Sequence, residues 1–475
     1  MNTQAGNSET KSRNIDADIV ILGAGAAGIA AAITAARSGA KTLLIDAGPI
    51  PGGELISGMA IDGALNARGE WILGGVGREI FDECERLGGY IGPLNDWRLI
   101  WYVCIDPEIM KLAVARCLAR AGVTLLLQTF ATDVTAHDGR VQSLSIINKE
   151  GRAQVHAPIF IDCSGDADLI RGAGGQTLHG GPKGELQPVS LMFRMSGVQT
   201  QPLLEFMRDH PEHFALGESD TIRQNRSDRE LAEAALIQNE PTVFLKGNGA
   251  LVQSAIDRGD LYPTALIMIQ PTSRSRREVC LNTTRVGDID GTRTTDLSAT
   301  LATLSDQVLQ CSTFMQKNVP GFEHATFSGI ASRLGVRETY RIQGVSTLTE
   351  DDVLQARKQA DGIGKGAHHV DIHQSGTGQI RIPVRDGGSY DIPWGCLIAD
   401  GVSNVAGAGR ILSSDRGANG SARVMGPCLA MGQAVGSAAV MLLKTQEHNH
   451  DFSQLDVGQL RTTLRAEGAV LDGTH

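Results

Sequence analysis

The stretch A-D-I-V-I-L-G-A-G-A-A-G-I-A-A-A-I-T-A-A-R-S-G-A-K-T-L-L-I-D, residues 17–46, decides the fold. Its apolar, β-branched start predicts a buried strand over 18–22, and the Ala-rich run that follows predicts a helix over 29–38. A second apolar run predicts another buried strand over 41–45. A strand, a helix and a parallel strand in this order indicate an α/β fold.

Three glycines at the predicted strand-to-helix turn, Gly23, Gly25 and Gly28, have the spacing G-x-G-x-x-G. The first allows a tight turn, the second lets the backbone approach a pyrophosphate, and the third lets helix and strand pack closely. The free N–H groups of the helix N-terminus favour an anion there. Asp46, 18 residues after Gly28, can accept hydrogen bonds from ribose hydroxyls. The pattern predicts a dinucleotide site and leaves NAD and FAD both open.

Composition excludes several classes of function. The chain has 475 residues, which is enough for two domains, and a net charge of −10 with 4% aromatic residues argues against a nucleic-acid partner. No run is long and apolar enough to predict a membrane span. The first 16 residues are polar, lack the apolar core of a secretory signal, and are expected to be a disordered lead-in.

The eight cysteines are widely scattered and include no C-x-x-C pair. A disulfide framework or an iron–sulfur cluster would need closer, patterned spacing. We therefore expect core thiols and a reducing, cytoplasmic location.

Several later segments carry a family resemblance together with the opening one. They are L-G-A-G-A-A-G at 22–28, I-D-P-E-I-M-K at 105–111, I-D-C-S-G-D-A-D at 161–168, R-L-G-V-R-E-T-Y-R-I-Q-G at 333–344, V-D-I-H at 370–373, V-A-G-A-G-R-I-L-S at 405–413 and S-A-R-V-M-G-P-C-L-A-M-G-Q-A-V-G-S-A-A at 421–439. Over roughly residues 15–445 the chain resembles FAD-dependent oxidoreductases with a glutathione-reductase-type FAD domain. More narrowly, it resembles the bacterial subgroup known simply as FAD-dependent oxidoreductases.

The resemblance implies an α/β fold, with a Rossmann-type FAD-binding domain of glutathione-reductase type and an inserted α+β substrate domain. The sequence pattern agrees with an inserted domain, because longer polar helical stretches and alternating strands replace the apolar pattern in the middle of the chain. The expected division is a first part of the FAD-binding domain at 15–175, a substrate or cap domain at 176–388, a second part of the FAD-binding domain at 389–446, and a C-terminal tail at 447–475.

The resemblance also implies FAD contacts in both halves of the chain. The early contacts would be Gly23, Ala24, Gly25, Ala26, Ala27 and Gly28 at the pyrophosphate, Asp46 and Ala47 at the ribose, Gly52 and Gly53 in the loop over the phosphates, and the backbone of Val134 at adenine. The later contacts would be Ser164, Gly165 and Asp166 in a second glycine motif, Gly409 and Arg410 beside the ribityl chain, and Gly432 and Gln433 on a helix whose positive end points toward the flavin ring.

Three departures from related families narrow the prediction. No second G-x-G-x-x-G follows a strand, so an NADPH domain is not expected, and paired redox cysteines are missing as well. Residues 49–62 contain no histidine, so FAD is expected to be non-covalent.

A proton acceptor for the reaction is predicted at His373. His369, Asp371 and His373 alternate, so on a strand they would share one face. Three ligands without a further Cys or His cluster make an incomplete metal site, and no metal is expected. Histidine is the commonest general base. For His369 a surface hydrogen-bonding role is the expected alternative.

Arginines are the predicted partners of a carboxylate-bearing substrate. Arg337 and Arg341 are four residues apart and would share one face of a helix, and Arg410 and Arg423 lie in the late FAD segment. Salt bridges to the many acids of the chain are the alternative role for these side chains.

These features predict an FAD-dependent dehydrogenase or oxidase that transfers a hydride between a small organic substrate, a carboxylate or an alcohol, and flavin N5. A flavin-dependent hydratase, isomerase or lyase, an FAD-bearing electron-transfer subunit and an NAD-dependent dehydrogenase stay open as alternatives. The expected partners are the small-molecule substrate and an unidentified electron acceptor, and homo-oligomerisation is left open.

Overall fold

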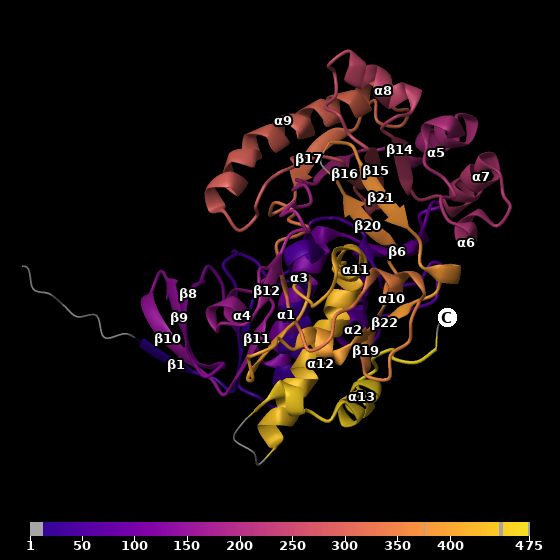
Figure 1. Ribbon diagram of the computed structural model, residues 1–475. Coiled ribbons are helices and arrows are strands. Elements are labelled where there is room, and N and C mark those ends of the chain that lie inside the picture. The colour runs from indigo at the N-terminus through magenta and orange to yellow at the C-terminus, as the bar shows by residue number, and fades with distance from the viewer. Residues whose placement is uncertain (1–12, 375, 446–449, 474–475) are drawn as a thin grey trace, which may run out of the picture.

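A five-stranded parallel sheet forms the base of the computed structural model, which describes residues 13–374, 376–445 and 450–473 (Figure 1). Its strand order is β23 (Val405–Gly407), β11 (Ile159–Asp162), β2 (Ile19–Leu22), β3 (Thr42–Ile45) and β7 (Thr124–Leu126). The early strands and the late strand β23 therefore share one sheet. This arrangement confirms the Rossmann-type α/β fold.

Helices α1 (Ala26–Arg37) and α12 (Met425–Lys444) pack directly on each other. Glycines make this possible, because a Cβ on Gly432 would lie 2.1 Å from the carbonyl oxygen of Ala27, and one on Gly436 would lie 2.6 Å from that of Ala31. Among the described residues α12 is the one helix long and apolar enough to cross a membrane, yet 83% of its apolar window is buried. Helix α12 is thus a buried helix of the core around the parallel sheet.

A small sheet beside the parallel one contains β8 (Phe130–His137), β9 (Arg140–Asn148), β10 (Gly151–His156) and β1 (Arg13–Asp16). Strands β8 and β9 form a hairpin that turns at Asp138 and Gly139, and both residues have positive φ, as a tight turn between twisted strands requires. The expected disordered lead-in is wrong for Arg13–Asp16, which pair in parallel with β10. Residues 1–12 lie outside the described residues.

An antiparallel sheet with covering helices occupies the upper part of Figure 1, as expected for the inserted region. Its strands are β14 (Val243–Lys246), β15 (Leu266–Ser273), β16 (Glu278–Asn282), β13 (Phe193–Ser196) and β17 (Thr326–Ile330). Its helices are α5 (Thr200–Asp209), α6 (Asp220–Arg223), α7 (Asp228–Gln238), α8 (Ala250–Asp257) and the long α9 (Thr294–Asn318).

The remaining strands and helices lie outside these three sheets. The strands are β4 (Ile61–Asp62), β5 (Tyr90–Asn95), β6 (Trp101–Ile105), β12 (Thr177–His179), β18 (Tyr340–Ile342), β19 (Gly362–Gly366), β20 (Val370–His373), β21 (Gln379–Ile382) and β22 (Tyr390–Pro393). The helices are α2 (Gly75–Arg86), α3 (Pro107–Ala121), α4 (Asp168–Gly172), α10 (Glu350–Leu354), α11 (Arg416–Ala422) and α13 (Val457–Ala466).

The packing places two segments differently from the sequence-based division. Leu348, Ile363 and Val384 already belong to the apolar core around the parallel sheet, so the chain returns to that core before residue 389. Within the segment expected as a C-terminal tail, Leu460 and Leu464 of α13 are fully buried in the same core. The division into domains otherwise stays a prediction.

All eight cysteines are free and buried, as expected for core thiols.

Candidate functional site

One cavity of about 280 Å³ extends from the glycine turn to the antiparallel sheet. Its lining comes from the turn after β2, the loop after β11, the segments 333–337 and 408–410, strand β20, and residues of β15 and β16. Segments far apart in the sequence therefore meet at one site.

The glycine turn has the backbone geometry that its spacing predicts. Gly23 has a φ of +99°, a conformation that side chains disfavour, and a Cβ on Gly28 would lie 1.8 Å from the carbonyl oxygen of Gly23. Asp46 follows β3 and braces this turn, since its Oδ2 accepts a hydrogen bond of 2.6 Å from the backbone N–H of Ala24 and its Oδ1 one of 2.7 Å from that of Gly48.

The residues present fit the pyrophosphate of a dinucleotide. Helix α1 begins after Gly25 with no side-chain cap and no acidic residue in its first turn, so its N-terminal N–H groups and dipole stay available to an anion. A Cβ on Gly25 would meet no atom within 4 Å, which means that this glycine leaves open space beside the turn. The turn thus offers donors, positive polarity and room at one place.

Many of the predicted cofactor residues line this cavity, namely Gly23, Gly25, Ala26, Ala27, Asp46, Gly53, Ser164, Gly165, Gly409 and Arg410. The lining does not include Ala24, Gly28, Ala47, Gly52, Val134, Asp166, Gly432 and Gln433.

The assignment of Gly432 and Gln433 to the cofactor is not supported by the packing. Gly432 lies against Ala27 of α1, and Gln433 Oε1 accepts a hydrogen bond of 3.1 Å from the backbone N–H of Val76. Both are in the middle of α12, whereas Met425 at its N-terminus lines the cavity. The helix end, rather than these two residues, borders the site.

The predicted salt-bridge alternative holds for two arginines. Arg410 binds Asp166 at 2.8 Å and donates to the carbonyl oxygen of Gly165, so it ties the loop after β11 to the late segment. Arg341 lies on strand β18 and binds Glu338 at 2.9 Å. The helix predicted for Arg337 and Arg341 is wrong, because β18 pairs with β12 in this region.

Arg337 and Arg423, here called the first arginine pair, are different. Arg337 Nη1 donates to the carbonyl oxygen of Pro188 and to Ser190 Oγ, and Arg423 Nη2 donates to Gln187 Oε1. Among the described residues no carboxylate oxygen lies within 4.0 Å of either guanidinium group.

Burial lowers the pKa of Arg337 to about 10 and also lowers the pKa of Arg423. Repulsion by the positive charge of Arg423 contributes to the lowered pKa of Arg337. Neither arginine therefore has a carboxylate in direct contact among the described residues, although Asp371 attracts both charges and Glu338 attracts that of Arg423.

Asp371 and His373 on β20 form a hydrogen-bonded couple at the same cavity. His373 Nε2 lies 2.8 Å from Asp371 Oδ2. Burial lowers the pKa of His373 to about 4, against the opposing effect of Asp371. The imidazole is therefore neutral at pH 7, and because its Nε2–H donates to the carboxylate, Nδ1 is the nitrogen that can accept a proton.

Two neighbouring histidines and Asp62 also line this end of the cavity. His368 Nδ1 donates to the carbonyl oxygen of His369, and its Nε2 lies 3.7 Å from Asp62 Oδ2. Burial raises the pKa of Asp62 to about 8 and lowers that of His368 to about 4. The surface role expected for His369 is wrong, since the residue is 6% exposed.

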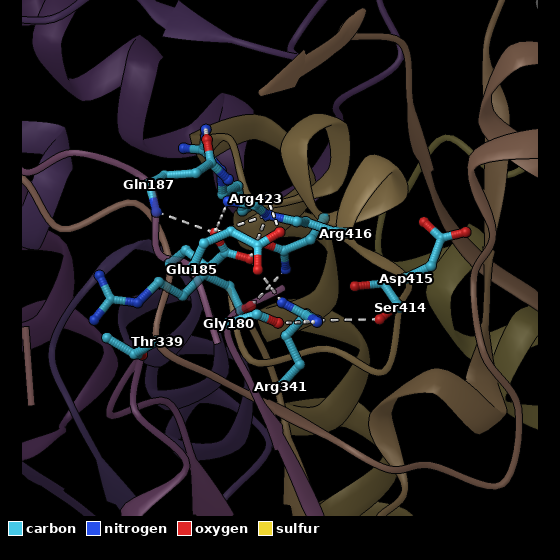
Figure 2. A network of polar contacts seen from close by, with 12 residues as sticks. Gly180, Glu185, Gln187, Thr339, Arg341, Ser414, Asp415, Arg416 and Arg423 are labelled. Atoms are coloured by element: carbon cyan, nitrogen blue, oxygen red, sulfur yellow. Dashed lines mark hydrogen bonds and ion pairs between the residues drawn. The ribbon is translucent and has the colours of Figure 1, made fainter. Parts of the chain in front are cut away.

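A buried ionic network holds the arginine end in place, and Figure 2 shows it at close range. Glu338 accepts from Arg341 and Arg416, and its Oε2 accepts the backbone N–H of Gln187 at 3.2 Å. The Gln187 side chain then accepts from Arg423 and from the backbone N–H of His373, at 3.3 and 3.2 Å. Gln187 therefore connects the network to one arginine and one histidine of the cavity.

A comparison with protein families supports the dinucleotide-binding fold that the glycine turn and strand β23 indicate. Residues 18–464 match the family model described as FAD dependent oxidoreductase. The chain belongs to this family. FAD is accordingly its cofactor, and the cavity end at Gly23–Ala27 is the place whose residues fit the pyrophosphate of FAD.

Individual proteins match this chain either over a short segment or at low sequence identity. Sarcosine oxidase subunit alpha of Rhizobium meliloti (strain 1021) is 53% identical over 51 residues, which are 10% of this chain and 5% of that protein. A geranylgeranyl bacteriochlorophyll reductase-like protein of Thermoplasma acidophilum has a similar structure at 12% identity and a TM-score of 0.45, covering 96% of this chain and 85% of that one. A flavin-dependent brominase has 14% identity and a TM-score of 0.47, covering 95% and 84%.

Sequence reasoning missed several residues of the cavity, namely Asp62, Asp96, Arg98, Arg285, His368 and Arg381. They come from several segments, with Asp96 and Arg98 in one of them, and carry no motif, although His368 adjoins the histidine pattern that was recognised. Only the folded chain brings them together.

Proposed function

We propose that the protein is an FAD-dependent dehydrogenase or oxidase of a small organic substrate that carries a carboxylate and an alcohol group. The observation that carries the proposal is the first arginine pair, which lines the same cavity as His373 and has no carboxylate within 4.0 Å among the described residues. Partly buried guanidinium groups without a carboxylate in direct contact are costly, and a substrate carboxylate would compensate them.

Each group has a defined task in this proposal. When bound, FAD supplies a hydride acceptor at flavin N5. The first arginine pair binds and orients the substrate carboxylate, and His373 Nδ1 accepts the hydroxyl proton. Asp371 stabilises the imidazolium that forms, because its Oδ2 lies 2.8 Å from His373 Nε2.

Protonation supports this division of tasks. A general base must be unprotonated before the reaction, and the pKa of about 4 leaves His373 neutral at pH 7. Burial opposes the charged form of Asp371, but its interactions with His373 hold the pKa of the carboxyl well below its usual range. The couple thus starts as a neutral imidazole and a carboxylate.

The test is anaerobic flavin reduction by a panel of 2-hydroxy acids, their esters and simple alcohols, followed by absorbance. Bleaching by the acids and much slower bleaching by the esters is the expected result. Equal rates with acid and ester would overturn the role of the arginine pair. Conversion of an acid without transient flavin reduction would instead favour a hydratase or isomerase.

A further inference from the structure

A second group of arginines lines the cavity apart from the first pair. Arg98 follows β5, and Arg381 lies on β21; we call them the second arginine pair. Both approach Glu218 Oε2, at 2.8 Å for Arg98 Nη2 and 3.7 Å for Arg381 Nη1. Glu218 therefore faces two guanidinium groups, and Asp371 approaches one of them, since its Oδ1 lies 3.9 Å from Arg381 Nε.

One arginine of each pair has a buried nitrogen without a hydrogen-bond acceptor. These atoms are Arg98 Nε and Arg423 Nε. A buried guanidinium N–H with no acceptor loses the hydrogen bond it makes in water, which costs free energy. Each pair therefore contains one guanidinium group whose hydrogen bonding is incomplete.

Asp371 and Asp96 also line the cavity, are ionised at pH 7 and offset part of the arginine charge. The carboxylate of Asp371 is already bound by His373 at 2.8 Å and Gln379 at 2.9 Å, and Arg381 Nε lies 3.9 Å from it. Asp62 is protonated at pH 7 because burial raises its pKa to about 8. Arg285 adds another positive charge to the lining and donates to the carbonyl oxygen of Gln374.

We propose that the cavity binds a small dicarboxylate, with one carboxylate at Arg337 and Arg423 and the other at Arg98 and Arg381. The inference rests on the proposed function, which already assigns the first carboxylate to the first arginine pair. Two planar carboxylates match two sets of guanidinium donors, each of which can bind both oxygens. Because Asp371 interacts electrostatically with arginines of both pairs, the His373–Asp371 couple lies in the field of both.

A carboxylate fits the second pair better than a phosphate monoester. Glu218 already compensates part of the charge there, and Asp371 lies 3.9 Å from Arg381. A group with nearly two negative charges would be repelled by both acids, whereas a carboxylate carries a single charge.

The experiment compares binding of chain-length-matched acids to the oxidised holoenzyme under anaerobic conditions. Malonate, succinate and glutarate are titrated against propionate, butyrate and valerate by calorimetry and by the flavin absorbance change. The tightest dicarboxylate is expected to bind at least about 30-fold more tightly than its matched monocarboxylate, the gain typical of an added charge-assisted contact.

Arg381→Met and Arg98→Met are each expected to reduce this ratio to below about 3-fold by removing that contact. Arg258→Met is the matched control, because Arg258 pairs with Asp260 on the surface and does not line the cavity. Since Arg98 is 4% exposed and its loss could impair folding, thermal melting is measured, and Arg381→Met alone decides the question if Arg98→Met does not fold.

Each outcome is decisive. An unchanged ratio in Arg381→Met, or equal binding of mono- and dicarboxylates to the wild type, overturns the dicarboxylate inference. If Arg423→Met still weakens both kinds of acid in those cases, the proposed function stands. If Arg423→Met weakens neither, the proposed function itself fails. Phosphoglycolate that binds more tightly than every dicarboxylate would overturn the choice of carboxylate at the second pair.

Discussion

The two ends of the cavity are built in opposite ways. At the glycine turn, backbone N–H groups and close packing make the site, and Gly23 and Gly28 matter because they lack a side chain. At the other end, charged side chains such as Arg423 and His373 make it, held by the network around Glu338. At a site built from backbone groups, replacing a glycine with a larger residue should impair folding. At a site built from side chains, replacing a charged residue should reduce function with little loss of stability.

The largest effect is expected at the glycine turn. Gly28→Ala would place a Cβ 1.8 Å from the Gly23 carbonyl oxygen, so it should destabilise the protein by about 4 kcal/mol or prevent folding, as overpacked cores with backbone strain do. Gly25→Ala meets no atom within 4 Å and should fold normally but lose at least about tenfold in FAD affinity, since its methyl group enters the space left for the pyrophosphate.

Denaturant unfolding of the apoproteins and FAD titration separate these two glycines. A Gly25→Ala protein that binds FAD as tightly as the wild type would show that the pyrophosphate does not lie at this turn. A stable, FAD-binding Gly28→Ala protein would contradict the claim that the glycine turn tolerates no added side chain at this position.

The second prediction concerns the side-chain end. Arg423→Met should slow flavin reduction by a carboxylate substrate about 100-fold, which corresponds to the loss of a charge-assisted contact in the transition state. Its FAD content and melting temperature should stay close to those of the wild type, because the guanidinium makes one 3.3 Å hydrogen bond to Gln187. Stopped-flow reduction and the flavin spectrum provide the measurement.

The third prediction uses pH. Burial holds the pKa of His369 well below 6.5, so the unfolded chain binds a proton more readily than the folded protein as the pH falls below 6.5. The stability that neutral His369 contributes is present above pH 6.5 and is lost as the pH falls. Relative to His369→Gln, the wild type should lose stability over this range. Parallel urea titrations of the two proteins would detect it, and equal slopes would contradict it.

The smallest effect is expected at Asp62. Its folded pKa of about 8 lies above the unfolded value, so protonated Asp62 stabilises the protein at low pH and this contribution disappears as the pH rises. Between pH 7 and 9 the wild type should lose about 1 kcal/mol relative to Asp62→Asn. Melting curves of both proteins at the two pH values measure this difference, and an unchanged gap would place the pKa outside this range.

The same contrast explains what the sequence could predict. The strand, turn and helix around Gly23–Gly28 follow local rules of spacing and backbone freedom. The start of α3 obeys a similarly local rule, since Asp106 accepts from the N–H of Glu108. The early strands and the parallel sheet were therefore correctly predicted.

The side-chain end could be predicted only in part. His373 and Arg423 were chosen by residue type, but Arg98, Asp62 and Arg381 approach them through tertiary packing that no local pattern encodes. The helix expected around Arg337 failed because four-residue spacing alone does not distinguish a helix from a strand that pairs with β12.

The contact between α1 and α12 has a consequence for synthesis of the chain. Gly432 and Gly436 lie against a helix that is made some four hundred residues earlier. Until α12 leaves the ribosome, the apolar surface of α1 has no partner from the late segment, and such exposed surface favours aggregation. FAD loading should accordingly be a late event in the biogenesis of this enzyme, and translation that stops before residue 425 should yield a chain that depends on chaperones.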